Sequence, residues 1–332
     1  MAAFPVIQRN DSVHIPKSFF EHTLGINWDM KPVDRNFDPQ KVQNYVSQLP
    51  TSADRGFVLD LLSKTTYVPY HLFKDALLKS FSTFRQSIGT KPFYLARMRS
   101  KVGSEDWLTA LLWPILRTMN LIDIIDEDAI ISLNGKINVL ILDDASYTGT
   151  NTFSKMDSIV YKSTRIEQLD NKQYRALGPN GRTQLQREAS SHFTFHIVIP
   201  FITHEAHNLI TQSFAQRFQS QIIFHSISVL PDLKGLVDVK QYYPEWSEND
   251  PYDTNLNNVL RQRFGVSEGW ETSISKMPAV YFDHKVAANM STFSSIYLDG
   301  RLPDGRNTGS LFKVDPSREK IIQLETLYNS QT

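Results

Sequence analysis

Two adjacent carboxylates, Asp143 and Asp144, follow an apolar run and precede a short loop that contains a glycine between two threonines. Carboxylate oxygens accept hydrogen bonds from sugar hydroxyls, so a pair of carboxylates can engage both hydroxyls of a vicinal diol. Gly149 lets the backbone approach a ligand closely, and hydroxyls together with N–H groups at a helix start can hold a phosphate dianion. The segment therefore predicts a site for a sugar phosphate.

The same segment resembles the phosphoribosyl-diphosphate (PRPP) site of type I phosphoribosyltransferases. That family carries four apolar residues, two acids, three variable residues, then Thr-Gly and a small or hydroxyl residue, and Val139–Thr150 fills every position. By this resemblance Asp143 and Asp144 bind the ribose hydroxyls of PRPP and act in catalysis. The residues expected to bind the phosphate are Ala145, Ser146, Tyr147, Thr148, Gly149, Thr150 and Asn151. Asn151 stands where the family usually has a hydroxyl residue, and a solvated turn after a strand is the alternative interpretation.

A basic loop, Arg99–Ser104, follows an apolar run and falls where this family places its diphosphate-binding loop. Such a loop must offer N–H groups and cations to a highly charged leaving group. Arg99 and Lys101 are expected to stabilise the departing diphosphate as catalytic residues. An ordinary solvated basic turn is the alternative.

A late segment, Tyr281–Lys285, follows the core strands. In phosphoribosyltransferases that use purines, an aromatic residue and a lysine beyond the core contact the base, and Phe282 and Lys285 are the expected counterparts. The helical N-terminal region, the Asp-Asp loop and this late segment together also look similar to the phosphoribosyltransferase-like proteins of microbial conflict and antiviral defence loci. That resemblance covers roughly residues 40–300. Surface salt bridges within the segment are the alternative interpretation.

Four histidines lie close together in the sequence, at positions 192, 196, 204 and 207. Their spacing is not His-Glu-x-x-His, and His196 falls inside an expected strand, so packing or surface roles are favoured over a metal site. Mg²⁺ is the expected metal. It would arrive bound to the diphosphate and needs only one or two protein carboxylates, here Asp143 and Asp144, rather than a cage of protein ligands.

The composition of the 332-residue chain limits the classes of function. The absence of cysteine excludes disulfides, zinc–thiolate sites and cysteine nucleophiles. Lys plus Arg and Asp plus Glu are both 35, so nucleic acid is not an indicated partner. The N-terminus lacks the pattern of a signal peptide, and the longest apolar segment, Leu108–Ile125, is interrupted by charged residues. We therefore expect a cytoplasmic protein without a membrane partner.

The pattern of apolar runs predicts the elements that must position these side chains. Strands are expected at residues 93–98, 137–142, 193–199, 221–227 and 279–282, and helices at 104–120 and 206–218. Strands that alternate with helices indicate an α/β fold, with a mostly parallel twisted sheet flanked by helices. A fold of the type I phosphoribosyltransferase kind is what the resemblance implies.

Three parts are expected along the chain. Residues 1–90 form an N-terminal arm and a helical region, residues 91–228 form the α/β core, and residues 229–332 form a C-terminal hood and tail. Within the core, residues 157–190 are charged and rich in turn residues, and they are interpreted as an insertion or an extended helix.

The function stays open between three hypotheses, because many catalytic members of the family carry a long closing loop where residues 121–136 are short and acidic. The first is a transferase that displaces diphosphate from PRPP with a nitrogenous base. The second is a non-catalytic nucleotide sensor or regulator, and the third is a defence-system effector that acts on nucleotides through the same pocket. The expected partners are PRPP or a nucleotide, together with a second copy of the chain or a defence-system protein.

Overall fold

The computed structural model describes residues 37–68, 70–97, 104–126, 131–146, 149–225, 228–230, 233–244, 258, 260, 262–264, 280–282 and 293–312. The first half of the chain contains α2 (Pro39–Ser47), α3 (Ser52–Lys64), β1 (Thr66–Val68), α4 (Tyr70–Ile88), β2 (Phe93–Arg97), α5 (Ser104–Leu116), β3 (Leu121–Asp126), β4 (Ile137–Leu142), β5 (Ala145–Ser146) and α6 (Thr150–Ser163). After the 3₁₀ turn Ile166–Gln168 come α7 (Asn171–Ser190), β6 (Phe193–Val198), β7 (Phe201–Thr203), α8 (His204–Asn208), the π-helical turn Leu209–Ser213, α9 (Phe214–Arg217), β8 (Gln221–Phe224) and β9 (Ser228–Leu230). The last described elements are α10 (Leu233–Leu236), α11 (Val239–Tyr242), β10 (Val280–Phe282) and α13 (Ser294–Asp299).

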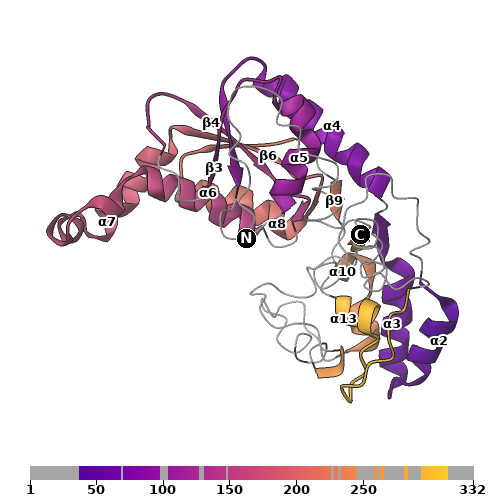
Figure 1. The fold of residues 1–332 in the computed structure, drawn as a ribbon. Helices are drawn as coiled ribbons and strands as arrows, with labels where there is room; N and C mark the ends of the chain where they lie inside the picture. Colours follow the sequence, from indigo (N-terminus) through magenta and orange to yellow (C-terminus); the bar gives the residue numbers. More distant parts are fainter. Residues whose placement is uncertain are drawn as a thin grey trace, which may run out of the picture.

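A five-stranded parallel sheet in the order β3-β2-β4-β6-β8 forms the centre of the fold. Alternate side chains of β4 point to opposite faces, as the period of two in a strand requires. Leu140 and Leu142 pack with α4 and α5, whereas Val139 and Ile141 pack with α6 and with the helical segment after β7. Figure 1 shows α4 and α5 on one side of the strands and α6 and α8 on the other. The predicted α/β class, with a mostly parallel sheet flanked by helices, is confirmed.

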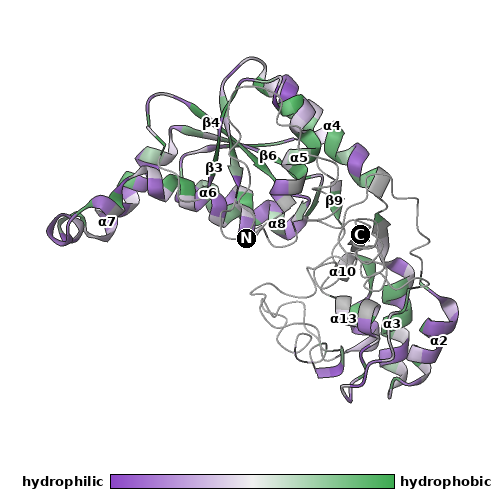
Figure 2. Ribbon diagram, viewed as in Figure 1, coloured by the Kyte–Doolittle hydropathy of each residue, from purple (hydrophilic) through white to green (hydrophobic). Residues whose placement is uncertain are grey.

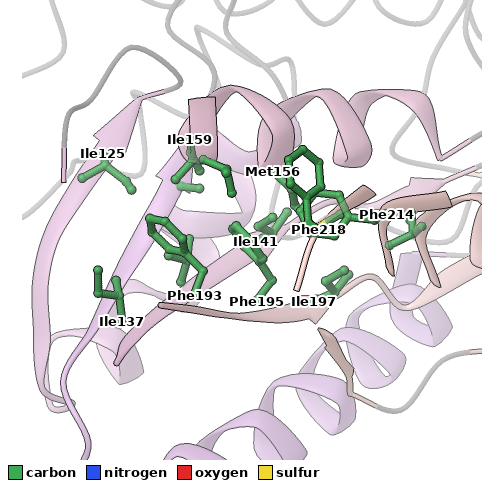
Figure 3. Packing of buried hydrophobic residues seen from close by; sticks show 14 of the residues in the cluster. Ile125, Ile137, Ile141, Met156, Ile159, Phe193, Phe195, Ile197, Phe214 and Phe218 are labelled. Carbon is green, nitrogen blue, oxygen red and sulfur yellow. The ribbon is translucent and has the colours of Figure 1, made fainter. Parts of the chain in front are cut away.

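The face of the sheet that α6 covers is filled by aromatic and branched aliphatic side chains. Ile141, Phe195 and Ile197 of the strands are fully buried against Met156 and Ile159 of α6. Figure 3 shows these side chains meeting between the strands and the helices. Packing of this kind fixes where α6 begins relative to the end of β4.

Three of the strands break at their carboxyl ends and then continue. Short strands β5, β7 and β9 follow β4, β6 and β8, and they pair in parallel in the order β5-β7-β9. The backbone ladder is maintained across the breaks, because the N–H of Asp143 donates to the carbonyl of Val198 at 3.2 Å and the N–H of Ser228 donates to the carbonyl of Pro200 at 2.9 Å. The break between β4 and β5 contains Asp143 and Asp144, the two carboxylates of the predicted site.

A third hydrophobic cluster, separate from those on the two faces of the sheet, is built from both ends of the described chain. Side chains of α2 and α3 pack against α11, α13 and residues 302–312, with Tyr45, Phe57, Phe264 and Tyr297 almost entirely buried. The parallel pairing of β1 with β10 also joins these distant parts of the sequence. Helix α4, by contrast, packs on the sheet.

Helix α7 covers most of the segment interpreted as an insertion or an extended helix, and it projects away from the strands (Figure 1). Gly178 interrupts it with a φ of 60°. Its surface is mostly hydrophilic, in contrast to the apolar strands (Figure 2). Among the described residues no helix combines the length and the apolarity needed to cross a membrane.

Candidate functional site

The chain reverses its direction of winding between β2 and β4. From β2 it passes through α5 to β3 on one side, and β4 then lies on the other side of β2. Because α5 and α6 cover opposite faces, this boundary is a topological switch point, and ligands of open α/β sheets bind there, outside the carboxyl ends of the strands. The predicted sugar-phosphate loop, residues 143–149, leaves β4 at this point and leads into α6.

The two predicted carboxylates have different surroundings. Asp143 is half-buried, whereas Asp144 is only 1% exposed. Each accepts a hydrogen bond from the next backbone N–H: Asp143 Oδ1 from Asp144 N at 2.9 Å, and Asp144 Oδ1 from Ala145 N at 2.8 Å. Asp144 therefore shapes the turn between β4 and β5, and Asp143 is the carboxylate that reaches the surface.

Gly149 sits at the start of α6 with a φ of 77°, a conformation that side-chain-bearing residues rarely adopt. A Cβ at this position would lie 2.8 Å from the carbonyl oxygen of Ala206 in α8. Gly149 therefore allows the backbone to approach α8 closely, whereas the sequence predicts that it allows a close approach to a ligand. As the N-cap of α6, Gly149 has no side chain to bond to the N–H groups of the first turn, and Thr150 and Asn151 in that turn are exposed.

The structure brings part of the predicted site together. Asp143, Asp144, Ala145, Ser146, Gly149, Thr150 and Asn151 lie between the end of β4 and the first turn of α6. Ala145 and Ser146 form β5 and are buried, so their side chains are not open to a ligand. Tyr147 and Thr148, which complete the loop, lie outside the described residues.

The remaining predicted site residues are placed only in part. Arg99 and Lys101, in the loop after β2, and Lys285 lie outside the described residues. Phe282 is the last residue of β10, and its backbone pairs with Val68 of β1. Residues 121–136 were expected to be a short acidic connection. They begin with an edge strand, β3, which pairs in parallel with β2.

A buried ion pair at the helix starts has no counterpart in the sequence-based prediction. Lys155 Nζ of α6 lies 3.5 Å from Glu105 Oε1 in the first turn of α5, and the two side chains are 3% and 5% exposed. Thr152, one turn earlier on α6, is also buried, and its Oγ1 has no hydrogen-bond partner. The available signal was the position of Lys155 on the apolar stripe of α6, four residues before Ile159.

The buried histidines form a separate polar chain across the sheet. Asn138 donates from Nδ2 to the carbonyl of Pro92 at 3.0 Å, so its Oδ1 accepts from His196 Nε2 at 3.3 Å. His196 Nδ1, 3.0 Å from His225 Nε2, is then the acceptor of that hydrogen bond. Burial lowers the pKa of both imidazoles to about 4, and for His196 the neighbouring His225 and Lys91 add to the effect. This chain of neutral rings is a structural network.

No metal site of protein ligands is found in the part of the chain that the structure describes. No group of three or more histidine, aspartate or glutamate side chains there is close enough to hold an ion. His192 Nδ1 lies 3.0 Å from the carbonyl oxygen of Gly135, and the ring of His207 packs on the ring of Phe224. Asp143, a half-buried carboxylate, fits a magnesium ion that is held mainly by ligand phosphates.

Comparison of the chain with protein-family models, with curated proteins and with solved structures gives no match.

Proposed function

We propose that the chain binds PRPP, or a related ribose phosphate, at the switch point between β2 and β4 and transfers the phosphoribosyl group to a nitrogenous base. The observation that carries this proposal is the position of the Asp143–Gly149 loop, which runs from the end of β4 to the uncapped start of α6 at the switch point. Such a helix start suits a phosphate, and a partly exposed carboxylate beside it suits ribose hydroxyls.

In the proposed reaction, the lone pair of a base nitrogen attacks C1′ of the ribose and forms a C–N bond. The bond from C1′ to the diphosphate oxygen breaks, the diphosphate leaves with that electron pair, and the nitrogen releases its proton. Asp143 would hold the sugar hydroxyls, and Asp144 would keep the turn in place. A magnesium ion on the diphosphate would offset its charge and improve it as a leaving group. Arg99 and Lys101 would stabilise the same charge.

Calorimetric titration of the full chain with PRPP and Mg²⁺ tests this assignment. Asp143→Asn keeps the size of the side chain but removes the negative charge, and we expect it to weaken binding by about tenfold or more. Asp299→Asn, on the exposed face of α13, is the matched control and should bind as the wild type does. Equal affinity in all three proteins, or no binding in any of them, would refute the donor site.

One observation favours a second function, a ligand-binding sensor or regulator without turnover. Closure of a lid excludes water from reactions of this type. Between α5 and β4 the chain forms the edge strand β3, and only residues 127–130 of this connection lie outside the described part, so this connection has no room for a long closing loop. Release of diphosphate on addition of a panel of bases would support the transferase, and binding of PRPP without release would support the sensor. For either function we place the protein in the cytoplasm.

A further inference from the structure

The ion pair of Lys155 with Glu105 joins two helices that pack on opposite faces of the sheet. The buried apolar residues of α5 belong to the hydrophobic cluster on the face of the sheet that α4 covers. Those of α6 belong to the cluster on the opposite face. Both helices begin beyond the carboxyl ends of neighbouring strands: α5 follows β2, and α6 follows β4 and its short continuation β5. A direct contact between them must therefore cross the carboxyl edge of the sheet between β2 and β4. The ion pair lies at the switch point itself.

The 3.5 Å separation of Lys155 from Glu105 is longer than that of a strongly stabilising ion pair. Burial of an ammonium and a carboxylate costs several kcal/mol per ion, and their attraction offsets that cost only with short, well-supported contacts. Charge-assisted N–H···O bonds are typically about 2.7–2.9 Å long. The separation of Lys155 from Glu105 is 3.5 Å, and both side chains are almost completely buried. At this distance the attraction between Lys155 and Glu105 offsets less of the cost of burying Lys155 than a short contact would.

Thr152 adds an unsatisfied polar group at the same place. It lies three residues before Lys155, so both side chains are on the same face of α6. Its Oγ1 is buried without a hydrogen-bond partner, and a buried polar atom in that state costs roughly 1–3 kcal/mol. A hydroxyl and an ammonium that lie one helical turn apart are both donors, and donors match the oxygens of a phosphate.

We propose that Thr152 and Lys155 form an anion subsite for a phosphate or diphosphate oxygen, with Glu105 as the counter-ion that Lys155 keeps until the anion arrives. The choice of anion rests on the proposed function. The subsite extends the start of α6 inward by about one turn, where the helix dipole also favours negative charge. Lys155 becomes a binding residue for the ligand.

Glu105 has a second source of stabilisation when the anion takes its place. It lies in the first turn of α5, where the helix dipole and the N–H groups favour a carboxylate. After the exchange, the ligand compensates the charge of Lys155, and the start of α5 compensates the charge of Glu105. The exchange also couples ligand binding to the helix that follows the loop of Arg99 and Lys101.

Titration of the full chain with inorganic diphosphate and Mg²⁺ tests the subsite without a ribose. We expect Lys155→Met to lower the affinity by about tenfold or more, because a charged hydrogen bond is lost. Thr152→Val, which keeps the shape, should lower it several-fold. Glu105→Gln removes the competing carboxylate and should raise the affinity by roughly three- to tenfold. Lys79→Met, on the exposed side of α4, is the control and should leave the affinity unchanged.

A purely structural pair predicts a different pattern. In that case Glu105→Gln would weaken diphosphate binding or leave it unchanged, and either result overturns the subsite, as does the absence of diphosphate binding by the wild type. If Lys155→Met does not fold, the double variant Glu105→Gln/Lys155→Met replaces both charges together, which buried pairs generally tolerate, and it must bind diphosphate about as weakly as expected for the single variant. The titration with PRPP tests the proposed function, and the titration with inorganic diphosphate tests the subsite. Either proposal can therefore fail without the other.

Discussion

Two buried charges in this molecule have opposite surroundings. Asp54 of α3 is completely buried, and its carboxylate accepts hydrogen bonds from Tyr243 Oη at 3.0 Å, from Thr51 Oγ1 at 2.7 Å and from Arg263 Nη1 at 2.5 Å. Lys155, at the end of the sheet, is nearly as buried, but its ion-pair contact with Glu105 is 3.5 Å long, and the hydroxyl of Thr152 beside it is unsatisfied.

The difference separates a structural cluster from a candidate binding cluster. The contacts of Asp54 with Tyr243 and Arg263 join parts of the chain that are about 200 residues apart, so this carboxylate links α3 to the C-terminal part of the same hydrophobic cluster. Beside Lys155 the hydroxyl of Thr152 is buried without a hydrogen-bond partner, and the ion-pair contact of Lys155 with Glu105 is long. An under-satisfied buried group calls for an explanation, and a ligand at the switch point supplies one.

The largest expected effect is on the stability of the hydrophobic cluster that contains α2, α3, α11 and α13. Asp54→Ala leaves Arg263 and Tyr243 without their acceptor, so we expect it to lower the free energy of unfolding by about 3–5 kcal/mol. Asp60→Ala on the same helix removes an ion pair with the exposed Lys64 and a hydrogen bond with Tyr242, and it should cost about 1 kcal/mol. Urea denaturation measures both. Equal losses in the two variants would show that the Asp54 network is not the support of this cluster.

The histidine chain predicts the next largest effect, a loss of stability in mild acid. The pKa of His196 and of His225 is about 4 in the folded protein and near 6.5 when unfolded, so the unfolded chain binds more protons between these values. The contribution of the two histidines to the free energy of unfolding is complete above pH 6.5 and falls as the pH approaches 4, by roughly 2 kcal/mol for each histidine at pH 5.

Urea titrations at pH 7 and pH 5 measure this loss. His204→Asn, at an exposed position in α8, should show the same dependence as the wild type. An unfolding free energy that is equal at the two pH values would mean that the buried histidines are not held in their neutral form.

Gly149→Ala should have an intermediate effect. The added Cβ combines a positive φ with a 2.8 Å approach to the carbonyl of Ala206, and we expect a cost of about 2–3 kcal/mol together with weaker PRPP binding. Gly89→Ala is a matched control, because its φ is +57° but nothing lies within 4 Å of its Cβ, so only about 1 kcal/mol is expected. Thermal unfolding compares the melting temperatures of the two variants. Equal decreases would show that the contact of residue 149 with α8 does not add to the cost.

The smallest effect distinguishes two buried threonines. Thr152→Val removes an unsatisfied hydroxyl, so the unfolding free energy should stay within about 1 kcal/mol of the wild type or rise. Thr203→Val removes the N-cap of α8, whose Oγ1 accepts from Ala206 N at 3.0 Å, and should cost about 1 kcal/mol. A clear loss of stability in Thr152→Val would indicate that its hydroxyl is satisfied after all.

The strands with continuous apolar runs were predictable from the sequence. The prediction for β4 agrees with the structure at both ends, and those for β2 and β6 agree to within one residue. Strand β3 was missed because Asp123 and Asp126 interrupt its apolar pattern, which an edge strand tolerates. The short strands β5, β7 and β9 depend on pairing with one another across long sequence separations, so no local pattern marks them.

The site was predictable where its residues are contiguous. Asp143, Asp144 and Gly149 form one motif, and their position at the end of a strand follows from the apolar run before them. The different burial of the two carboxylates follows from the tertiary packing of β5, and the motif gives no sign of it. Glu105 and Lys155 meet only because two helices start at the same edge of the sheet, so their contact could not be read from either segment alone.

A crystal structure of the full chain with PRPP and Mg²⁺ tests the central claim most directly. The account predicts the 5′-phosphate against the N–H groups of the first turn of α6, the ribose hydroxyls on Asp143, and Lys155 turned from Glu105 towards a phosphate oxygen. Ligand density at another place on the molecule, or density at the switch point that does not contact Asp143, would contradict it.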